Sequence, residues 1–177
     1  LETNLEGLLE YTYEPDKNEF RGIKFSENTC EKTFEGYIRE DGQVGIRNEI
    51  WIINTVGCVN KIAEKLAKEA NKLFADRKID GVHYFAHPYG CSQMGEDQLY
   101  TQKILADLVH HPNAGGVLVL GLGCENNNIP EFKKVIKQWN PDRVKFMNAQ
   151  DVENEMEEGL AILAQLADYA EKFEREP

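Results

Sequence analysis

Three cysteines stand at equal intervals along the chain, each directly after a glycine. Cys58 follows the run INTVG, Cys91 follows AHPYG and Cys124 follows LGLG. Deprotonated thiols are nucleophiles and good ligands for soft or borderline metal ions. A set of three protein ligands leaves one coordination position open, as a catalytic metal site requires. We therefore predict that these thiols form a metal site, the alternative being that they are packed small hydrophobic residues.

Polar residues lie beside two of these cysteines. His87 stands four residues before Cys91, where it could be a further ligand or an acid/base group, or a loop histidine bonded to the backbone. Glu125, Asn126 and Asn127 directly follow Cys124. Their side chains could hydrogen-bond a polyhydroxylated ligand, although an asparagine here could also cap a helix.

The elements that position these residues alternate between strands and helices. Apolar runs predict strands over residues 50–56, 81–87, 115–122 and 143–148, and three-and-four repeats predict helices over 59–74, 96–110 and 152–173, with a short helix near Pro130. This alternation predicts an α/β fold, a Rossmann-like three-layer sandwich with a mainly parallel sheet. The three cysteines then follow three strand ends at one edge of the sheet, where ligands of such folds bind. His83 lies in the middle of a predicted strand and is interpreted as a packed histidine.

The chain divides into an arm and one domain. Residues 1–35 have little apolar periodicity and predict a linker or arm, in which Cys30 has no part in the repeating pattern. Residues 36–177 predict the Rossmann-like domain. Asp41 and Gly42 separate two apolar runs and indicate a hairpin at the start of this domain.

Charge and hydropathy limit the classes of partner. The formal net charge is −11, which repels nucleic acid and anionic lipid surfaces. No apolar stretch approaches the roughly 20 residues of a membrane-spanning helix, and the first residues do not resemble a secretory signal. We predict a soluble, cytoplasmic protein with free or metal-bound thiols.

Several motifs in order resemble one enzyme family. The segments GYIREDGQVGIRN, NTVGCV, HPYGC and HPNAGGVLVLGLGCENN, between about Gly36 and Ile129, are similar to the altronate/galactarate dehydratase family of sugar-acid dehydratases, which includes sulfolactate sulfo-lyase large subunits. Ser92 stands where the family pattern would place a glycine. The resemblance implies a lyase that removes water from altronate or galactarate and gives a 2-keto-3-deoxy acid. It also implies a divalent metal, typically iron (Fe²⁺), or an iron-sulfur cluster, held by Cys58, Cys91 and Cys124.

The resemblance also implies that this chain is the middle portion of a longer enzyme. Its partners would then be a sugar-acid substrate, a small N-terminal domain, a C-terminal domain and further copies in a homo-oligomer, and the isolated fragment would be inactive. The alternative is a non-catalytic small-molecule or nucleotide binding module, since GLGCEN begins like a dinucleotide-binding sequence but lacks its third glycine.

Overall fold

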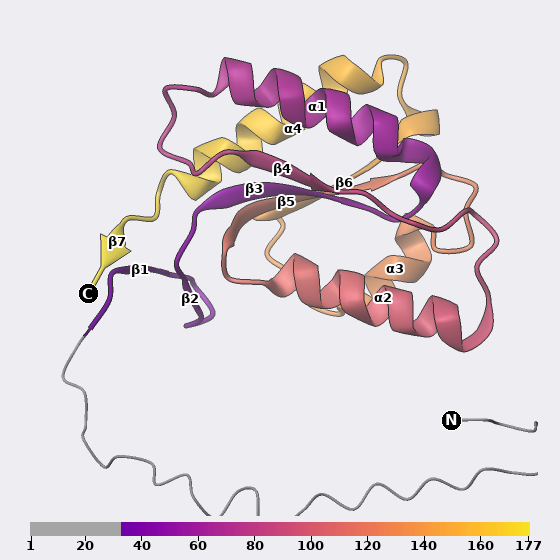
Figure 1. Cartoon of the computed structure of the whole chain (residues 1–177), viewed down its shortest axis with the longest axis horizontal. Helices are drawn as coiled ribbons and strands as arrows, with labels where there is room; N and C mark the ends of the chain where they lie inside the picture. Colours follow the sequence, from indigo (N-terminus) through magenta and orange to yellow (C-terminus); the bar gives the residue numbers. More distant parts are fainter. Residues whose placement is uncertain (1–32) are drawn as a thin grey trace, which may run out of the picture. The chain divides into compact units, whose positions relative to one another are not determined.

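The structure is a computed structural model that describes residues 33–177 (Figure 1). The predicted arm, residues 1–35, falls almost entirely outside the described residues, and so does Cys30. Both predictions about that segment therefore remain predictions.

A four-stranded parallel sheet forms the centre of the domain. Its strands are, in the order in which they lie side by side, β4 (Val82–Phe85), β3 (Glu49–Asn54), β5 (Ala114–Gly121) and β6 (Val144–Asn148). Every neighbouring pair is parallel. This confirms the predicted α/β class, with β4 and β6 as the edge strands.

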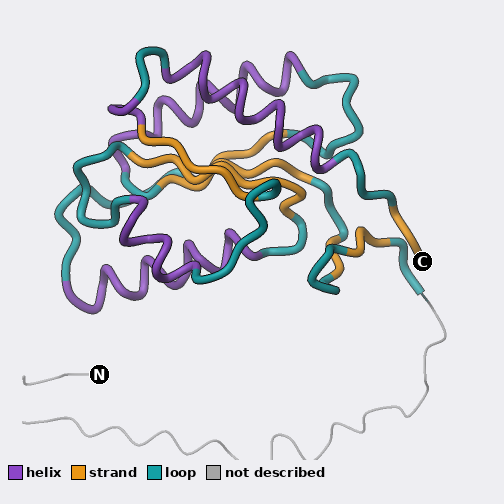
Figure 2. Tube along the Cα trace, turned by 180° about the vertical axis from the view of Figure 1, so that it is seen from behind, coloured by secondary structure: helices purple, strands orange, loops and turns teal. Residues whose placement is uncertain are grey.

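Helices cover both faces of this sheet. One face is covered by α1 (Asn60–Leu73) and α4 (Glu155–Ala170), and the other by α2 (Gly95–His110) and α3 (Ile129–Ile136), as Figures 1 and 2 show. Short 3₁₀ turns, Gly57–Val59 and Ala149–Asp151, precede α1 and follow β6. Among the helices of residues 33–177, none is long and apolar enough to cross a membrane.

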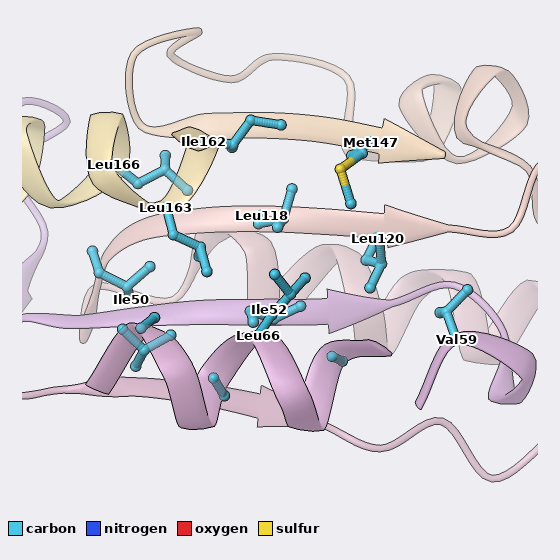
Figure 3. Close-up of a cluster of buried hydrophobic side chains, with 14 of the residues drawn as sticks. Ile50, Ile52, Val59, Leu66, Leu118, Leu120, Met147, Ile162, Leu163 and Leu166 are labelled. Carbon is cyan, nitrogen blue, oxygen red and sulfur yellow. The ribbon is translucent and has the colours of Figure 1, made fainter. Parts of the chain in front are cut away.

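Alternation along the central strands explains the three layers. Ile50 and Ile52 of β3 face α1 and α4, whereas Trp51 and Ile53 face α2 and α3. All eight residues of β5 are buried, because this strand has a helix layer on each side. Figure 3 shows the first of the two cores, where side chains from three strands, two helices and the 3₁₀ turn before α1 meet: Ile50, Ile52, Val59, Leu66, Leu118, Leu120, Met147, Ile162, Leu163 and Leu166.

A small antiparallel sheet lies beside the starts of the central strands (Figure 1). Its strands are, in order, β2 (Val44–Gly45), β1 (Gly36–Ile38) and β7 (Arg175–Glu176). The turn between β1 and β2 contains Gly42 at φ 81°, and this confirms the predicted hairpin. Strand β7 was not predicted, because two charged residues carry no apolar pattern.

The packed interpretation of His83 is wrong. Its side chain is 53% exposed, because β4 is an edge strand and this part of its surface faces solvent. An apolar-looking run therefore identified the strand but not its place in the sheet.

Replacement of a central leucine tests the core. Leu118→Ala should lower the free energy of unfolding by about 2–5 kcal/mol, because Leu118 is fully buried in the core between the sheet and helices α1 and α4, and its truncation leaves a cavity. Leu99→Ala is the matched control, since Leu99 on α2 is 55% exposed, and it should change that free energy by no more than about 0.5 kcal/mol. Urea unfolding of both variants measures the difference. Equal losses in the two variants would contradict this description of the core.

Candidate functional site

The loops that carry the three cysteines meet at the C-terminal edge of the parallel sheet. The Gly57 N–H donates to the Tyr89 carbonyl at 2.8 Å, which joins the loop after β3 to the loop after β4. The Asn126 N–H donates to the Cys91 carbonyl at 2.9 Å, which joins the loop after β4 to the loop after β5. The Cys91 loop therefore bridges the other two, and the predicted convergence of the loops is confirmed.

All three thiols are exposed and free. Cys58 lies in the 3₁₀ turn after β3, Cys91 in the loop after β4, and Cys124 in the turn after β5. The alternative that these cysteines are packed in the core is therefore wrong. Within residues 33–177, no three His, Cys, Asp or Glu side chains form a group that could hold a metal ion as they stand.

Glu125 fixes the turn that carries Cys124. Its side chain is buried and accepts hydrogen bonds from the Thr55 hydroxyl at 2.6 Å, the Leu122 N–H at 3.1 Å and the Gly123 N–H at 2.7 Å. Burial alone would raise the pKa of Glu125, but these hydrogen bonds outweigh it and hold the pKa below its usual range. A charged Glu125 thus ties the Cys124 turn to the end of β3.

Gly121 leaves a polar space beside this carboxylate. A Cβ atom at Gly121 would lie 2.7 Å from Asn148 Oδ1, 2.8 Å from Glu125 Oε1 and 3.3 Å from Thr55 Oγ1. Only glycine therefore fits where these three oxygens approach the strand. Sequence reasoning missed Thr55 and Asn148, although a polar residue at the end of an apolar strand was a signal that could have found them.

The two predicted asparagines differ in their surroundings. Asn126 is exposed, and its side chain donates to the Gln93 carbonyl at 3.2 Å. Asn127 is buried, and its Oδ1 accepts from Gln102 Nε2 at 2.9 Å. The next residue, Asn128, caps α3 by accepting from the Glu131 N–H, so one asparagine of this run is structural.

His87 is buried beside these loops. Asn60 at the start of α1 accepts from the His87 N–H and donates to the His87 carbonyl, both at 2.9 Å. His87 Nδ1 lies 3.1 Å from the Tyr89 nitrogen and 3.2 Å from the Tyr89 carbonyl oxygen, so it accepts from the N–H in one neutral tautomer and donates to the carbonyl in the other. Burial lowers the pKa of His87, against a smaller opposite effect of the Tyr89 backbone, so the ring is neutral at pH 7.

Buried polar atoms without a partner mark the same edge. In residues 33–177 there are four such side-chain atoms: Asn54 Oδ1, His87 Nε2, Asn127 Nδ2 and Asn148 Oδ1. Each belongs to the end of a different parallel strand or to the loop that follows it. Buried polar groups nearly always have partners, so this edge presents donors and acceptors that a bound molecule could satisfy.

The donors at this edge suit a metal by their chemistry. Three exposed thiols on loops that are hydrogen-bonded to one another match the ligands preferred by iron, zinc and other soft or borderline ions. Their side chains would have to move to share one ion, or an additional ligand would have to complete the set.

The fold and this edge agree with one class of enzyme domain. Residues 36–171 match the family described as D-galactarate dehydratase/Altronate hydrolase, second domain. Since this match covers most of the chain, the chain belongs to that family.

Individual relatives support the same assignment. The chain is 45% identical over 177 residues to an altronate dehydratase of Bacillus subtilis and 42% identical over 179 residues to one of Escherichia coli. These alignments cover 98% and 99% of this chain, which spans about a third of the length of each relative, 34%. A (2R)-sulfolactate sulfo-lyase subunit beta of Chromohalobacter salexigens is 33% identical over 91 residues, 51% of this chain and 21% of that protein. No solved structure shows a significant match.

A methyl group at Gly57 should separate two of the loops. An added Cβ would lie 2.9 Å from the Tyr89 carbonyl oxygen and 3.1 Å from that of His87, and both are backbone atoms that cannot turn away. Gly57→Ala should therefore lower the free energy of unfolding by about 1–3 kcal/mol, measured by urea unfolding. Gly90→Ala is the control, because a Cβ there meets no atom within 4 Å. A Gly57→Ala variant as stable as Gly90→Ala would show that the loops are not packed as described.

Glu125 should make stability depend on pH. Glu125→Gln should cost about 1–3 kcal/mol at pH 7, because a charged acceptor of buried donors is lost. The folded pKa of Glu125 is depressed, so its contribution is complete above the ordinary value near 4.5 and disappears as pH falls through the folded pKa. Urea unfolding between pH 7 and 3 should show the two proteins converging, whereas exposed Glu153→Gln should match the unchanged chain throughout. A constant difference at every pH would contradict the assignment.

Proposed function

We propose that this chain is the part of a sugar-acid dehydratase that carries metal ligands. The reaction would remove water from altronate or galactarate and give a 2-keto-3-deoxy acid. The observation that carries the proposal is the meeting of three thiol-bearing loops at an edge rich in unpartnered polar atoms. Two relatives named altronate dehydratase, each aligned over nearly the whole chain, support the substrate class.

Cys58, Cys91 and Cys124 would hold a divalent metal, with iron as the first candidate and an iron-sulfur cluster as the second. When bound, such a metal would supply positive charge that stabilises the developing charge on a substrate carboxylate. The protein contributes the placement of the ligands. Glu125 and Thr55 fix the turn of Cys124, and the Gly57–Tyr89 hydrogen bond holds the loop of Cys58 against that of Cys91.

His87 would act as the acid/base group of this site. With its proton on Nδ1, 3.2 Å from the Tyr89 carbonyl oxygen, the neutral ring can accept a proton at the buried Nε2, which has no partner within residues 33–177. The Asn60 side chain forms hydrogen bonds with both the N–H and the carbonyl of His87. These bonds fix the backbone of His87 and thereby restrict the position of its ring. These properties suit proton transfer better than a role in packing.

Asn126 and Asn127 are the candidates to bind substrate hydroxyls. The Asn126 amide is exposed, and Asn127 Nδ2 lacks a partner. Glu125 was predicted beside them, and in this proposal it acts through the turn that it holds, because both of its oxygens already accept hydrogen bonds from the protein.

The remainder of the activity would come from other residues. The relatives are about three times as long as the matched region, so further domains and further copies of the enzyme are the proposed partners. We propose that the 177-residue chain alone binds metal but does not turn over substrate, and that the enzyme works in the cytoplasm.

Metal binding by the thiols tests the proposal without an activity assay. Under anaerobic, reducing conditions the chain should bind about one Fe²⁺ or Co²⁺ ion, and Co²⁺ should produce thiolate charge-transfer absorption in the near ultraviolet. Cys58→Ser, Cys91→Ser and Cys124→Ser should each weaken binding at least about tenfold, since each removes a ligand. Cys30→Ser is the matched control and should leave both affinity and absorption unchanged.

Two results would contradict the proposal. Absence of thiolate absorption, or equal binding by the Cys124→Ser and Cys30→Ser variants, would remove the metal site. If a longer protein containing this chain bound metal yet released no 2-keto acid from D-altronate or D-galactarate, the metal site would stand and the proposed reaction would fall.

A further inference from the structure

A polar cavity lies at the other edge of the parallel sheet, where the strands begin. It has a volume of about 470 Å³ and is formed by the β1–β2 turn, the end of α2, the loop before β6 and the end of α4. Its lining combines two arginines, a tyrosine, a tryptophan, a histidine, two side-chain amides and two carboxylates: Arg39, Arg143, Tyr169, Trp139, His110, Gln138, Asn140, Glu40 and Asp41. A cavity of this size and chemistry is suited to a small polar ligand.

Both arginines are buried and bonded only to neutral acceptors. Arg143, which is 9% exposed, donates from Nε to the Ala114 carbonyl at 3.1 Å and from Nη2 to the His111 carbonyl at 2.9 Å. Arg39, which is 5% exposed, donates from Nε to the Pro112 carbonyl at 2.8 Å. Its Nη1 and Nη2 donate to Asn48 Oδ1 and the Arg47 carbonyl, both at 2.9 Å.

Within residues 33–177, neither guanidinium lies within 4.0 Å of a carboxylate oxygen. The eight ion pairs found there all involve other residues. Burial and then the neighbouring charge of Arg143 lower the pKa of Arg39 to about 10. The charge of Asp41 acts in the opposite direction on both arginines, from beyond ion-pair distance. Two buried positive charges without an anion in direct contact are costly, and an anion in the cavity would compensate them further.

The remaining groups restrict the kind of anion. Burial raises the pKa of Tyr169 to about 12, as does nearby Glu40, so its hydroxyl remains a donor. Asn140 Nδ2 donates to Glu40 at 2.5 Å and to the Tyr169 oxygen at 3.2 Å. Glu40 and Asp41 are exposed at the mouth of the cavity, where their charges oppose an anion that carries more than one negative charge.

We propose that this cavity binds a small hydroxy acid through its carboxylate, with Arg143 and Arg39 as the cationic partners. Arginine suits this role because its planar group can donate two parallel hydrogen bonds to a carboxylate. Gln138 and Tyr169 supply donors and acceptors for hydroxyl groups, and Asn140 Oδ1 supplies a further acceptor, since both hydrogens of Asn140 Nδ2 are already used within the protein. The site is separate from the thiol edge and does not rest on the proposed dehydratase activity.

Titration with D-gluconate, a monovalent hydroxy acid, tests the proposal. Tryptophan fluorescence should change on binding, because Trp139 lines the cavity, and calorimetry should give the same Kd. Arg143→Gln should raise that Kd about tenfold or more through the loss of a charged hydrogen-bond partner. Glu40→Gln should lower the Kd about two- to fivefold, because it removes an opposing charge. Cys58→Ser and Cys124→Ser should leave the Kd unchanged, which separates this site from the thiol edge.

Arg47→Gln is the matched control, since it removes an exposed arginine that is not part of the cavity. The Kd of this variant for D-gluconate should stay within about twofold of that of the unchanged chain. If Arg143→Gln does not fold, Glu40→Gln still tests the proposal. Tighter binding of D-gluconate by this variant is expected only if the carboxylate of the ligand lies in this cavity. The proposal is overturned if D-gluconate does not bind, if its Kd is insensitive to both Arg143 and Glu40, or if inorganic phosphate binds and D-gluconate does not.

Discussion

The burial of the two central strands on both faces is the constraint on which the rest of this domain depends. Strands β3 and β5 present apolar side chains alternately to two helix layers, so neither can exist without a helix on each side. The helical connections then return the chain to the same edge before every strand. All four strand ends therefore lie together, and residues from separate parts of the sequence become neighbours there.

At that edge, the loops are held by hydrogen bonds between their backbones and by a few buried polar side chains. Glu125 and Thr55 join the loop after β5 to the end of β3, while Asn60 joins the start of α1 to His87. The exposed thiols thus stand on a framework that hydrogen bonds hold in place, while the thiols themselves are exposed and form no disulfide. This division explains how a site can be prepared for a ligand without its three sulfur atoms already sharing one position.

The sequence allowed the class of fold and nearly all helices and strands to be predicted, because apolar residues repeat with the period of each element. The ends of strands also located the cysteine loops. What could not be predicted depends on tertiary contacts. The hydrogen bond between Glu125 and Thr55 joins residues 70 positions apart, and the pairing of Tyr37 with Arg175 joins β1 to β7. Solvent exposure of His83 follows from the edge position of β4, which the order of elements along the chain does not determine. The composition of the arginine cavity escaped prediction for the same reason, since its lining comes from four regions of the chain.

The two edges of the sheet hold side chains of opposite charge, because the backbone presents N–H groups at one edge and carbonyl groups at the other. Where strands end and helices begin, N–H groups are free, and the carboxylate of Glu125 is held there by the amides of Leu122 and Gly123. Where helices end and strands begin, carbonyl groups are free, and Arg143 and Arg39 are held there by the carbonyls of the α2–β5 loop. The same polarity that holds the Glu125 carboxylate at one edge therefore retains buried guanidinium groups at the other. Since those carbonyls are neutral, they fix the arginines in position without cancelling their charge, and it is this remaining charge that makes the cavity beside the arginines suited to an anion.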